Sequence, residues 1–511
     1  MKRIPLVLAG LASVALISAG AAPHRTLRLE IFDRGVLAAG IVENSPSARW
    51  VQQAFGDPNA LTIDWILVPR QQEAQKLNAM LAAGDAPDLC LTNDAALVGG
   101  YAAQGKLADL TTFLQNAPTL RGFLGNDVLD YGAWKGKIFA IPGKRQRSGV
   151  SGTWIRKDWL DILGLPLPTS RDQWLSAVRA FHDRDPGRIG ANLAPIGGGG
   201  VDANILYSFY MPSTERDQAA WIGPSSGRPG RDISIPGAKE GMRFLNMLQN
   251  EGLFQKNWAL WPKNDVLNFQ TALANGCVGS FTNSPSYMWS YNLMPAIRKN
   301  APDSYWVPID PFMNAEGKTP KYVSSPIGTF TIVPFFSRNA DLVVKYLDWM
   351  ADAKNLTKLM FGDEGVHYSL SPEGIILPKP LTGDRVWEVT NIMDRAIILT
   401  GRPYDSIEKA VKAQVLSWTD HRYTPALFID HYRYMEKDGV PPVRIANPPE
   451  SLARLGPMLL DRAAEIQKNL IMAKPSEFDA LFDASLNEWM DMGARQVKAD
   501  MARQYDAEHG K

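Results

Sequence analysis

Glu364, His367 and Tyr368 bring a carboxylate, an imidazole and a phenol together within five residues, in the stretch GDEGVHY at residues 362–368. Such groups perform general acid–base chemistry in enzymes and hydrogen-bond polar ligands in binding proteins. The stretch follows a segment expected to form a helix on a sheet, residues 339–350, and its glycines are typical of a turn. A turn on a rigid scaffold often presents side chains to a ligand, so this stretch is the first candidate for a binding or catalytic wall.

Other catalytic and metal-binding patterns do not occur in the sequence. The six histidines include no HExxH pair, and there is no Gly-x-Ser-x-Gly elbow. Glycine-rich stretches at residues 197–200 and 223–237 lack the Gly-Lys-Ser/Thr of a phosphate cradle and are expected to be loops. Abundant Asp and Glu leave a glycosidase open, because sequence does not give the carboxylate separation that decides it. The eight regular strand–helix units of a barrel glycosidase are not visible.

Hydrophobic periodicity predicts the elements that position these residues. Apolar and polar residues alternate over residues 27–31 and 61–67, which predicts two strands. The period changes to that of a helix over residues 74–81, and an apolar run at residues 87–91 predicts the next strand. Strand, helix and strand in this order are the unit of a parallel sheet.

Later segments repeat this pattern and add helices. Ser170 and Gln173 form a capping box at the start of a predicted helix, and Asn339 is a candidate cap for the helix at residues 339–350. The tail from Pro448 onward has a mostly helical pattern. The chain is therefore expected to form two α/β lobes, to leave the first sheet and re-enter it, and to end in a helical extension.

The N-terminus and the composition indicate a secreted protein. Lys2 and Arg3 precede an apolar run and the small residues at positions 19–21, which predicts a signal peptide over residues 1–21, cleaved on export. No cysteine follows the run, so a lipid anchor is not expected. A formal net charge of +1 gives no basic footprint for nucleic acid. Cys90 and Cys277 are expected to be small buried hydrophobes, although one bridge between them stays open.

Five ordered motifs resemble a known family. They are AGDAPDL at residues 83–89, WKGKIFAIP at 134–142, WIRKDWL at 154–160, KYLDW at 345–349 and GDEGVHY at 362–368. Together they resemble family 1 extracellular solute-binding proteins of carbohydrate ABC importers, in the subgroup that includes the periplasmic alginate-binding proteins. The resemblance extends from about residue 26 to about residue 505.

The resemblance implies an α/β periplasmic-binding-protein type II fold, with two lobes joined by a hinge and a helical C-terminal extension. The N-terminal lobe is expected over residues 22–148 and 324–378, and the C-terminal lobe over residues 149–323 and 379–511. It implies a monomeric periplasmic protein, not an enzyme, that holds an oligosaccharide in the interlobe cleft and delivers it to permease subunits. A secreted polysaccharide-active enzyme and a binding protein for a non-sugar solute are the alternatives.

Position within the fold selects the candidate ligand contacts. Asn93 and Asp94 end a strand, where α/β sheets bind ligands, but they fit a helix cap or turn equally well. Tyr287 and Trp289 have core packing as their alternative. The turn at residues 362–368 either contacts sugar or only shapes the cleft. The complete set is Arg34, Asn93, Asp94, Tyr287, Trp289, Glu364, His367, Tyr368, Trp387, Arg395 and Tyr404.

The resemblance also bears on cofactors and on ligand charge. Alginate-type members carry a calcium loop, whose counterpart here keeps only Asp185 and Asn192 as side-chain oxygen donors. Calcium takes six to eight oxygen ligands, so the site is expected to be lost and no cofactor is expected. Four basic residues that could line the cleft would favour an acidic sugar, but three of them adjoin the expected hinge and could simply be solvated, so the ligand's charge stays open. These residues are Arg34, Lys144, Arg145 and Arg147.

Overall fold

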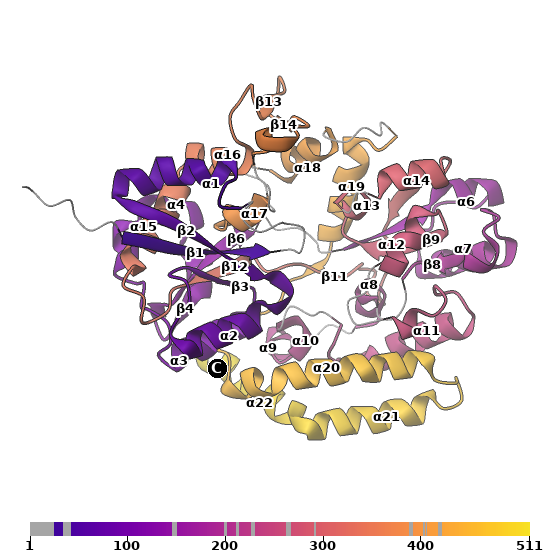
Figure 1. The fold of residues 1–511 in the computed structure, drawn as a ribbon. Coiled ribbons are helices and arrows are strands. Elements are labelled where there is room, and N and C mark those ends of the chain that lie inside the picture. The colour runs from indigo at the N-terminus through magenta and orange to yellow at the C-terminus, as the bar shows by residue number, and fades with distance from the viewer. Residues whose placement is uncertain are drawn as a thin grey trace, which may run out of the picture.

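The computed structural model shows two α/β bodies side by side, with helices of the C-terminal region along one side of both (Figure 1). It describes residues 25–33, 42–145, 151–198, 202–210, 214–225, 230–261, 267–290, 293–387, 392–401, 404, 406–416 and 422–510. The predicted signal peptide, Arg34 and Arg147 lie outside these residues.

The first body is built on strands from three separate parts of the chain. Strands β1 (Arg25–Asp33) and β2 (Leu61–Pro69) pair in parallel. Strands β15 (Leu399–Thr400), β6 (Ala140–Arg145), β12 (Ile327–Ile332) and β3 (Cys90–Thr92) form a four-stranded sheet in that order. A parallel bridge between Leu29 and Leu89 joins the two groups of strands. The predicted return of the chain to its first sheet is thereby confirmed.

Helix α2 (Glu73–Ala83) connects β2 to β3, as the sequence pattern predicts. Its Leu77 and Leu81 are buried against the sheet side, and the helix ends at Gly84 with φ +70°. A left-handed residue after the last helical turn is the ordinary helix stop, and glycine adopts it without steric cost. The predicted strand–helix–strand unit is confirmed.

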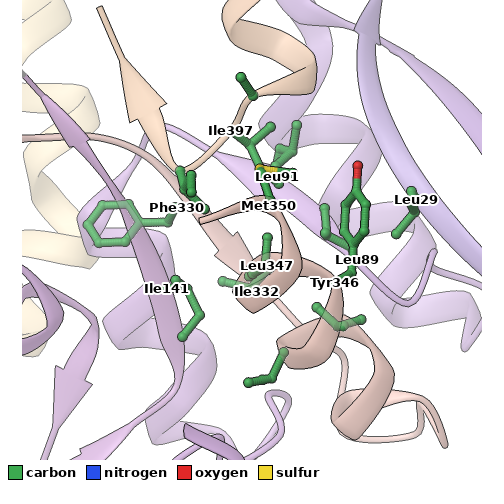
Figure 2. Packing of buried hydrophobic residues seen from close by; sticks show 14 of the residues in the cluster. Leu29, Leu89, Leu91, Ile141, Phe330, Ile332, Tyr346, Leu347, Met350 and Ile397 are labelled. Atoms are coloured by element: carbon green, nitrogen blue, oxygen red, sulfur yellow. The ribbon is translucent and has the colours of Figure 1, made fainter. Parts of the chain in front are cut away.

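The first core forms where helix α15 (Ala340–Met350) packs on these strands. Figure 2 shows Tyr346, Leu347 and Met350 of the helix beside Leu91 and Ile332 of the sheet. Each of these side chains is at most 2% exposed. Burial of this kind contributes roughly 1.5–3 kcal/mol per large apolar side chain, which makes α15 a main stabiliser of this body.

The segment at residues 396–400 belongs to the first core. Ile397 packs with the same cluster (Figure 2), and Leu399 pairs with Lys144 of β6. This segment lies beyond residue 378, where the sequence analysis ends the N-terminal lobe. The signal was weak because two paired residues are too few to show a strand period. The full division of the chain into lobes stays a prediction.

The second body has a four-stranded sheet of its own, with strand order β10 (Trp306–Ile309), β7 (Gly152–Arg156), β9 (Val278–Asn283) and β8 (Ala194–Ile196). Helices α6 (Lys157–Leu163), α7 (Arg171–Arg184) and α11 (Ala238–Asn250) supply apolar faces to its core. Two tryptophans of the WIRKDWL motif, Trp154 and Trp159, are completely buried there. That motif is therefore a packing motif.

Two predicted helix caps differ from the observed ones. Ser170 accepts a hydrogen bond from the Gln173 amide at 3.3 Å, as predicted, but Gln173 accepts from the amide of Thr169, not of Ser170. Asn339 precedes α15 without capping it, because its side-chain amide donates to Thr26 O and to Asp88. Tertiary hydrogen bonds to β1 thus replace the local one.

Helices α20 (Glu450–Met472), α21 (Phe478–Trp489) and α22 (Arg495–His509) form the C-terminal extension, which confirms the helical tail. They complete the second core, and α20 also contacts α3 (Ala95–Ala103) of the first body. No helix within the described ranges is long and apolar enough to cross a membrane. Cys90 and Cys277 are both free and buried, so they are not bridged.

Candidate functional site

A polar pocket lies where the chain crosses between the two bodies. One crossing leads from β6 in the first sheet to β7 in the second, and Gly152 opens β7. The return runs from β11 (Lys321–Tyr322) into β12. Figure 1 places β11 between the two bodies. The pocket is lined by Gly152, Thr153, Asn204, Ile309, Asp310, Phe312, Pro320, Lys321 and Tyr434.

Asn204 is fixed in the pocket wall by the start of helix α8 (Ala203–Tyr207). Asp202 caps this helix by accepting hydrogen bonds from the amides of Asn204, at 2.8 Å, and Ile205, at 3.1 Å. The Asn204 side-chain amide donates to Ser151 O at 3.1 Å. The capped helix therefore holds an amide side chain at the wall without rotational freedom.

Lys321 and Asp310 form a buried ion pair in the same wall, with Nζ and Oδ1 2.8 Å apart. Lys321 also donates to the carbonyl and hydroxyl oxygens of Thr319, at 2.6 and 3.0 Å. Burial lowers the pKa of Lys321, and the negative charge of Asp310 opposes that shift. A buried ion pair needs such additional hydrogen bonds to offset its desolvation. Both charges are thus held in place.

Tyr434 supplies an aromatic ring to the pocket from helix α19 (Pro425–Glu436). Its side chain is 37% exposed, and its hydroxyl has no hydrogen-bond partner within the part of the chain that the structure describes. An exposed aromatic side chain can stack on the apolar face of a ring. The Asn204 amide and the Asp310 carboxylate are already bonded within the protein, to Ser151 and to Lys321.

Gly152 separates the pocket from the buried imidazole of His431. A Cβ atom at Gly152 would lie 1.9 Å from His431 Nε2, so no other residue fits without a shift. His431 is completely buried and meets Trp154 edge-on, with ring centroids 4.4 Å apart. Burial lowers the pKa of His431 to about 3, which keeps the imidazole neutral.

The turn at residues 362–368 is fixed by its own side chains. His367 Nδ1 accepts a hydrogen bond from the Asp363 amide at 2.8 Å, and the His367 ring packs on Trp387 with centroids 5.1 Å apart. Glu364 is exposed, and Tyr368 is buried at the start of β13 (Tyr368–Leu370). The turn lies at the edge of the first body, near α16 (Ala353–Phe361) (Figure 1). These contacts fit the structural interpretation of the turn.

Three further predicted residues pack within the first body. Trp387 is 9% exposed and donates from Nε1 to Leu359 O at 3.1 Å. The hydroxyl of Tyr404 accepts a hydrogen bond from the Ile376 amide at 3.0 Å. Arg395 is 1% exposed, and its guanidinium lies over the Trp65 ring at 4.2 Å.

Tyr287 and Trp289 belong to a third hydrophobic cluster, in the second body. Tyr287 is 5% exposed, and Trp289 packs edge-on against Tyr423 and Phe428. These contacts are core packing, which was the alternative to ligand contact for Tyr287 and Trp289.

Asn93 and Asp94 are exposed at the end of β3 in the first sheet. Asp94 caps α3 by accepting from the Leu97 amide at 3.3 Å. Asn93 accepts from Thr329 at 3.1 Å and donates from its side chain to Glu73 at 2.7 Å. Of the predicted contacts within the described chain, these two and Glu364 are the exposed ones.

The pocket lining includes none of the predicted contacts, and sequence reasoning missed its residues. Asp310 directly follows β10, so the strand-end rule that selected Asn93 would have selected it in the second sheet. No local signal marks Tyr434, because its place depends on how α19 packs. As ligand contacts, the eleven predicted residues stay predictions.

The counterpart of the family calcium loop uses its one acidic residue for backbone bonds. Asp185 accepts from the amides of Ile189 and Gly190, at 2.8 and 2.7 Å. Both carboxylate oxygens thus bind the loop itself. No group of three or more His, Cys, Asp or Glu residues suited to a metal ion occurs within the described ranges.

Comparison with known families gives a match over residues 43–356 to the model described as bacterial extracellular solute-binding protein. The match covers more than half of the chain. This protein is a bacterial extracellular solute-binding protein. The family resemblance stated from the motifs is confirmed.

Two relatives of this solute-binding protein are named for what they bind. The fructooligosaccharide ABC transporter substrate-binding protein FusA of Streptococcus pneumoniae serotype 4 is 26% identical over 231 residues, which cover 41% of this chain and 42% of the relative. The polygalacturonan/rhamnogalacturonan-binding protein YtcQ of Bacillus subtilis strain 168 is 24% identical over 324 residues, which cover 60% and 61%. The chain thus spans about half the length of these relatives.

Solved structures of such proteins share the fold. The alginate-binding protein AlgQ2 without calcium ion has a TM-score of 0.66 at 18% identity, covering 94% of this chain and 98% of that one. A solute-binding protein from Bifidobacterium longum subsp. infantis has 0.67 at 19%, with the same coverage. The two-lobed α/β fold of type II periplasmic binding proteins, with its hinge and helical C-terminal extension, is confirmed.

Proposed function

We propose that this solute-binding protein captures an oligosaccharide or glycan fragment between its lobes and delivers it to an ABC importer. The match to the family of bacterial extracellular solute-binding proteins carries the proposal, and the small polar pocket on the second body beside the interlobe crossing, whose lining includes Tyr434, supports it. The relatives named for fructooligosaccharide and polygalacturonan binding support the same ligand class.

Binding without turnover is favoured over the polysaccharide-active enzyme. Glycosidases use two carboxyl groups across the scissile bond. Asp310 is the one carboxylate in the pocket lining, and it is paired with Lys321. A carboxylate held in an ion pair serves as a fixed hydrogen-bond acceptor, which suits a receptor.

The partner, the compartment and the metal requirement follow from this function. The permease subunits of an importer would receive the sugar. The predicted signal peptide and the membership of a solute-binding family both point to the periplasm as the compartment. The protein would act as a monomer and without calcium, since Asp185 already binds two backbone amides. Adding calcium or a chelator should then leave its melting temperature unchanged.

A thermal-shift screen against oligosaccharides tests the proposal. A ligand that binds the folded state raises the melting temperature by mass action. Tyr434→Ala should reduce the shift given by the best sugar, whereas Phe335→Ala, which truncates a 61% exposed ring on the first body, should not. No shift with any sugar would contradict the carbohydrate assignment and favour a non-sugar solute.

A further inference from the structure

Residues 441–449, which we call the strap, connect strand β16 (Gly439–Val440) to helix α20. A pair of prolines stands at each end of the strap, at 441–442 and 448–449, and proline fixes the backbone angle φ. β16 pairs in parallel with β11, with Gly439 opposite the pocket residue Lys321. Because β11 leads the chain back into the first sheet, the strap also starts in the direction of the first body.

On the second body, the strap is held by the carboxylate of Glu508 on helix α22. Glu508 accepts hydrogen bonds from the amides of Ala446 and Asn447, both at 2.8 Å, and from the Gln504 side chain at 2.9 Å. Burial would raise the pKa of Glu508, but these hydrogen bonds outweigh burial and lower it. Ile445 packs against the second core. The strap is therefore fixed to the second body.

On the first body, the strap contacts a hairpin that belongs to the WKGKIFAIP motif. Strands β4 (Ala133–Trp134) and β5 (Lys137–Ile138) form this hairpin. Lys135 and Gly136 make its turn with φ +50° and +77°, as a tight two-residue hairpin requires. Asn447 of the strap accepts a hydrogen bond from the Lys135 amide at 3.1 Å. The motif thus presents a backbone donor to the strap.

Arg444 adds a second contact between the strap and the first body. Its guanidinium lies over the Tyr131 ring, 4.6 Å from the ring centroid, and donates a hydrogen bond to Asp130 O. Tyr131 and Asp130 directly precede the hairpin in the sequence. The two bodies are therefore joined by the strap as well as by the crossings of the chain.

The first body does not cover the pocket in this arrangement of the lobes. Within the described chain, the pocket lining comes from the second body and from β11, and Tyr434 is exposed. A ligand held between two lobes requires closure of one lobe over the other about the hinge. Closure moves the hairpin relative to the strap, so the contacts of Asn447 and Arg444 belong to the open arrangement.

We propose that the strap holds the lobes in the open arrangement and thereby sets the affinity of the protein for its sugar. This inference rests on the proposed function. A contact that exists only in the open state must break on closure, so it weakens the binding of a ligand that needs the closed state. The inference also gives the WKGKIFAIP motif a role, because its hairpin is the part of the first body that the strap contacts.

Calorimetric titration of strap variants with kestose, maltotriose and trigalacturonate tests the inference. Asn447→Ala and Arg444→Ala each remove one contact with the first body. We expect each variant to bind the preferred sugar roughly 2–10-fold more tightly than the native protein, the factor given by one hydrogen bond or one stacked cation. Arg462→Ala, which removes an arginine paired with Glu465 and Glu488 within the C-terminal helices, should leave the affinity unchanged.

Small-angle X-ray scattering of the ligand-free variants measures the lobe arrangement without sugar. Loss of a strap contact should let the lobes close more often, so the radius of gyration should fall in Asn447→Ala and Arg444→Ala and stay native in Arg462→Ala. Native binding with unchanged or weaker affinity in both strap variants would overturn the inference and leave the proposed function intact. Silence from all three sugars would contradict the proposed function. In that case a smaller radius of gyration in the strap variants would still support the open-state contact, and an unchanged one would overturn it.

Discussion

At the residue scale, two buried titratable groups make stability change with pH in opposite directions. The pKa of His431 is lowered to about 3 by burial, and neither ring nitrogen has a partner among the described residues. Burial raises the pKa of Glu30 to about 8, despite the hydrogen bond that it accepts from the Leu91 amide. Each group therefore stays neutral in the folded protein over a pH range in which it is charged in the unfolded chain.

For His431 this predicts a loss of stability in acid. Below pH 6.5 the unfolded chain binds a proton that the folded state does not, so the free energy of unfolding falls by about 1.4 kcal/mol per pH unit down to pH 3. His431→Leu should remove this slope in urea unfolding at pH 3–4.5, below the pH range in which Glu30 contributes an opposing slope. His182→Leu, at a side chain that is 45% exposed, should retain it. Equal slopes in the two variants would contradict the prediction.

For Glu30, stability changes with pH in the opposite direction. Between pH 4.5 and pH 8 the unfolded chain loses a proton that the folded state keeps, so stability falls as the pH rises. Glu30→Gln should remove this decline while keeping an acceptor for Leu91, and Glu364→Gln, at an exposed position, should not. Since the two slopes oppose each other between pH 4.5 and 6.5, the native protein should show little pH dependence there. A native-like slope in Glu30→Gln would contradict this assignment.

At the element scale, the turn at residues 362–368 stabilises the fold through its glycine conformations and side-chain packing. Gly362 has φ +78° and ψ −143°, a conformation that essentially only glycine adopts, and a Cβ there would lie 2.6 Å from His367 and 2.9 Å from Trp387. Gly365 has φ +80°, but nothing lies within 4 Å of its Cβ position. Gly362 therefore combines a backbone that only glycine adopts with a crowded Cβ position, whereas Gly365 has a positive φ without crowding.

We expect Gly365→Ala to cost about 1–2 kcal/mol of unfolding free energy from strain alone. Gly362→Ala should cost roughly 1–3 kcal/mol more, because His367 and Trp387 must move. Chemical denaturation of the two variants measures the difference. Sugar affinity should be unchanged in both, and a selective loss of affinity in Gly362→Ala would return the turn to the binding site.

Sequence reasoning predicted elements correctly but did not find the pocket, for a physical reason. The period of apolar residues encodes which face is buried, so β1, β2 and α2 were readable from local pattern. The pocket depends on tertiary placement: Tyr434 on α19 and Lys321 on β11 are brought together from more than a hundred residues apart. Residue type alone does not tell a packed side chain from an exposed one: His367 and Trp289 pack against other rings, whereas Tyr434 is exposed.

At the scale of the whole molecule, the C-terminal helices are part of the second lobe's core and also contact the first lobe. Leu470 of α20 is completely buried in the second core. Beside the helices, the Asn447 side chain accepts a hydrogen bond from the Lys135 amide at 3.1 Å. If the lobes move about the hinge, the hydrogen bond between Lys135 and Asn447 must therefore break or move with them.

Leu470→Ala should lower the unfolding free energy of the protein by about 2–5 kcal/mol, the cost of emptying a packed site. Met458→Ala, on the same helix at a position that is 44% exposed, should change it by less than about 0.5 kcal/mol. Urea unfolding followed by tryptophan fluorescence measures both. Equal effects would mean that α20 is a peripheral addition.

The central claim is that this solute-binding protein holds an oligosaccharide between its lobes and releases it unchanged. Calorimetric titration with the best sugar of the thermal-shift screen, followed by mass analysis of the recovered sugar, tests it most directly. The account predicts saturable binding of one sugar per chain, weakened in Tyr434→Ala, with the sugar recovered intact. New reducing ends in the recovered sugar, or no heat of binding with any glycan, would contradict it.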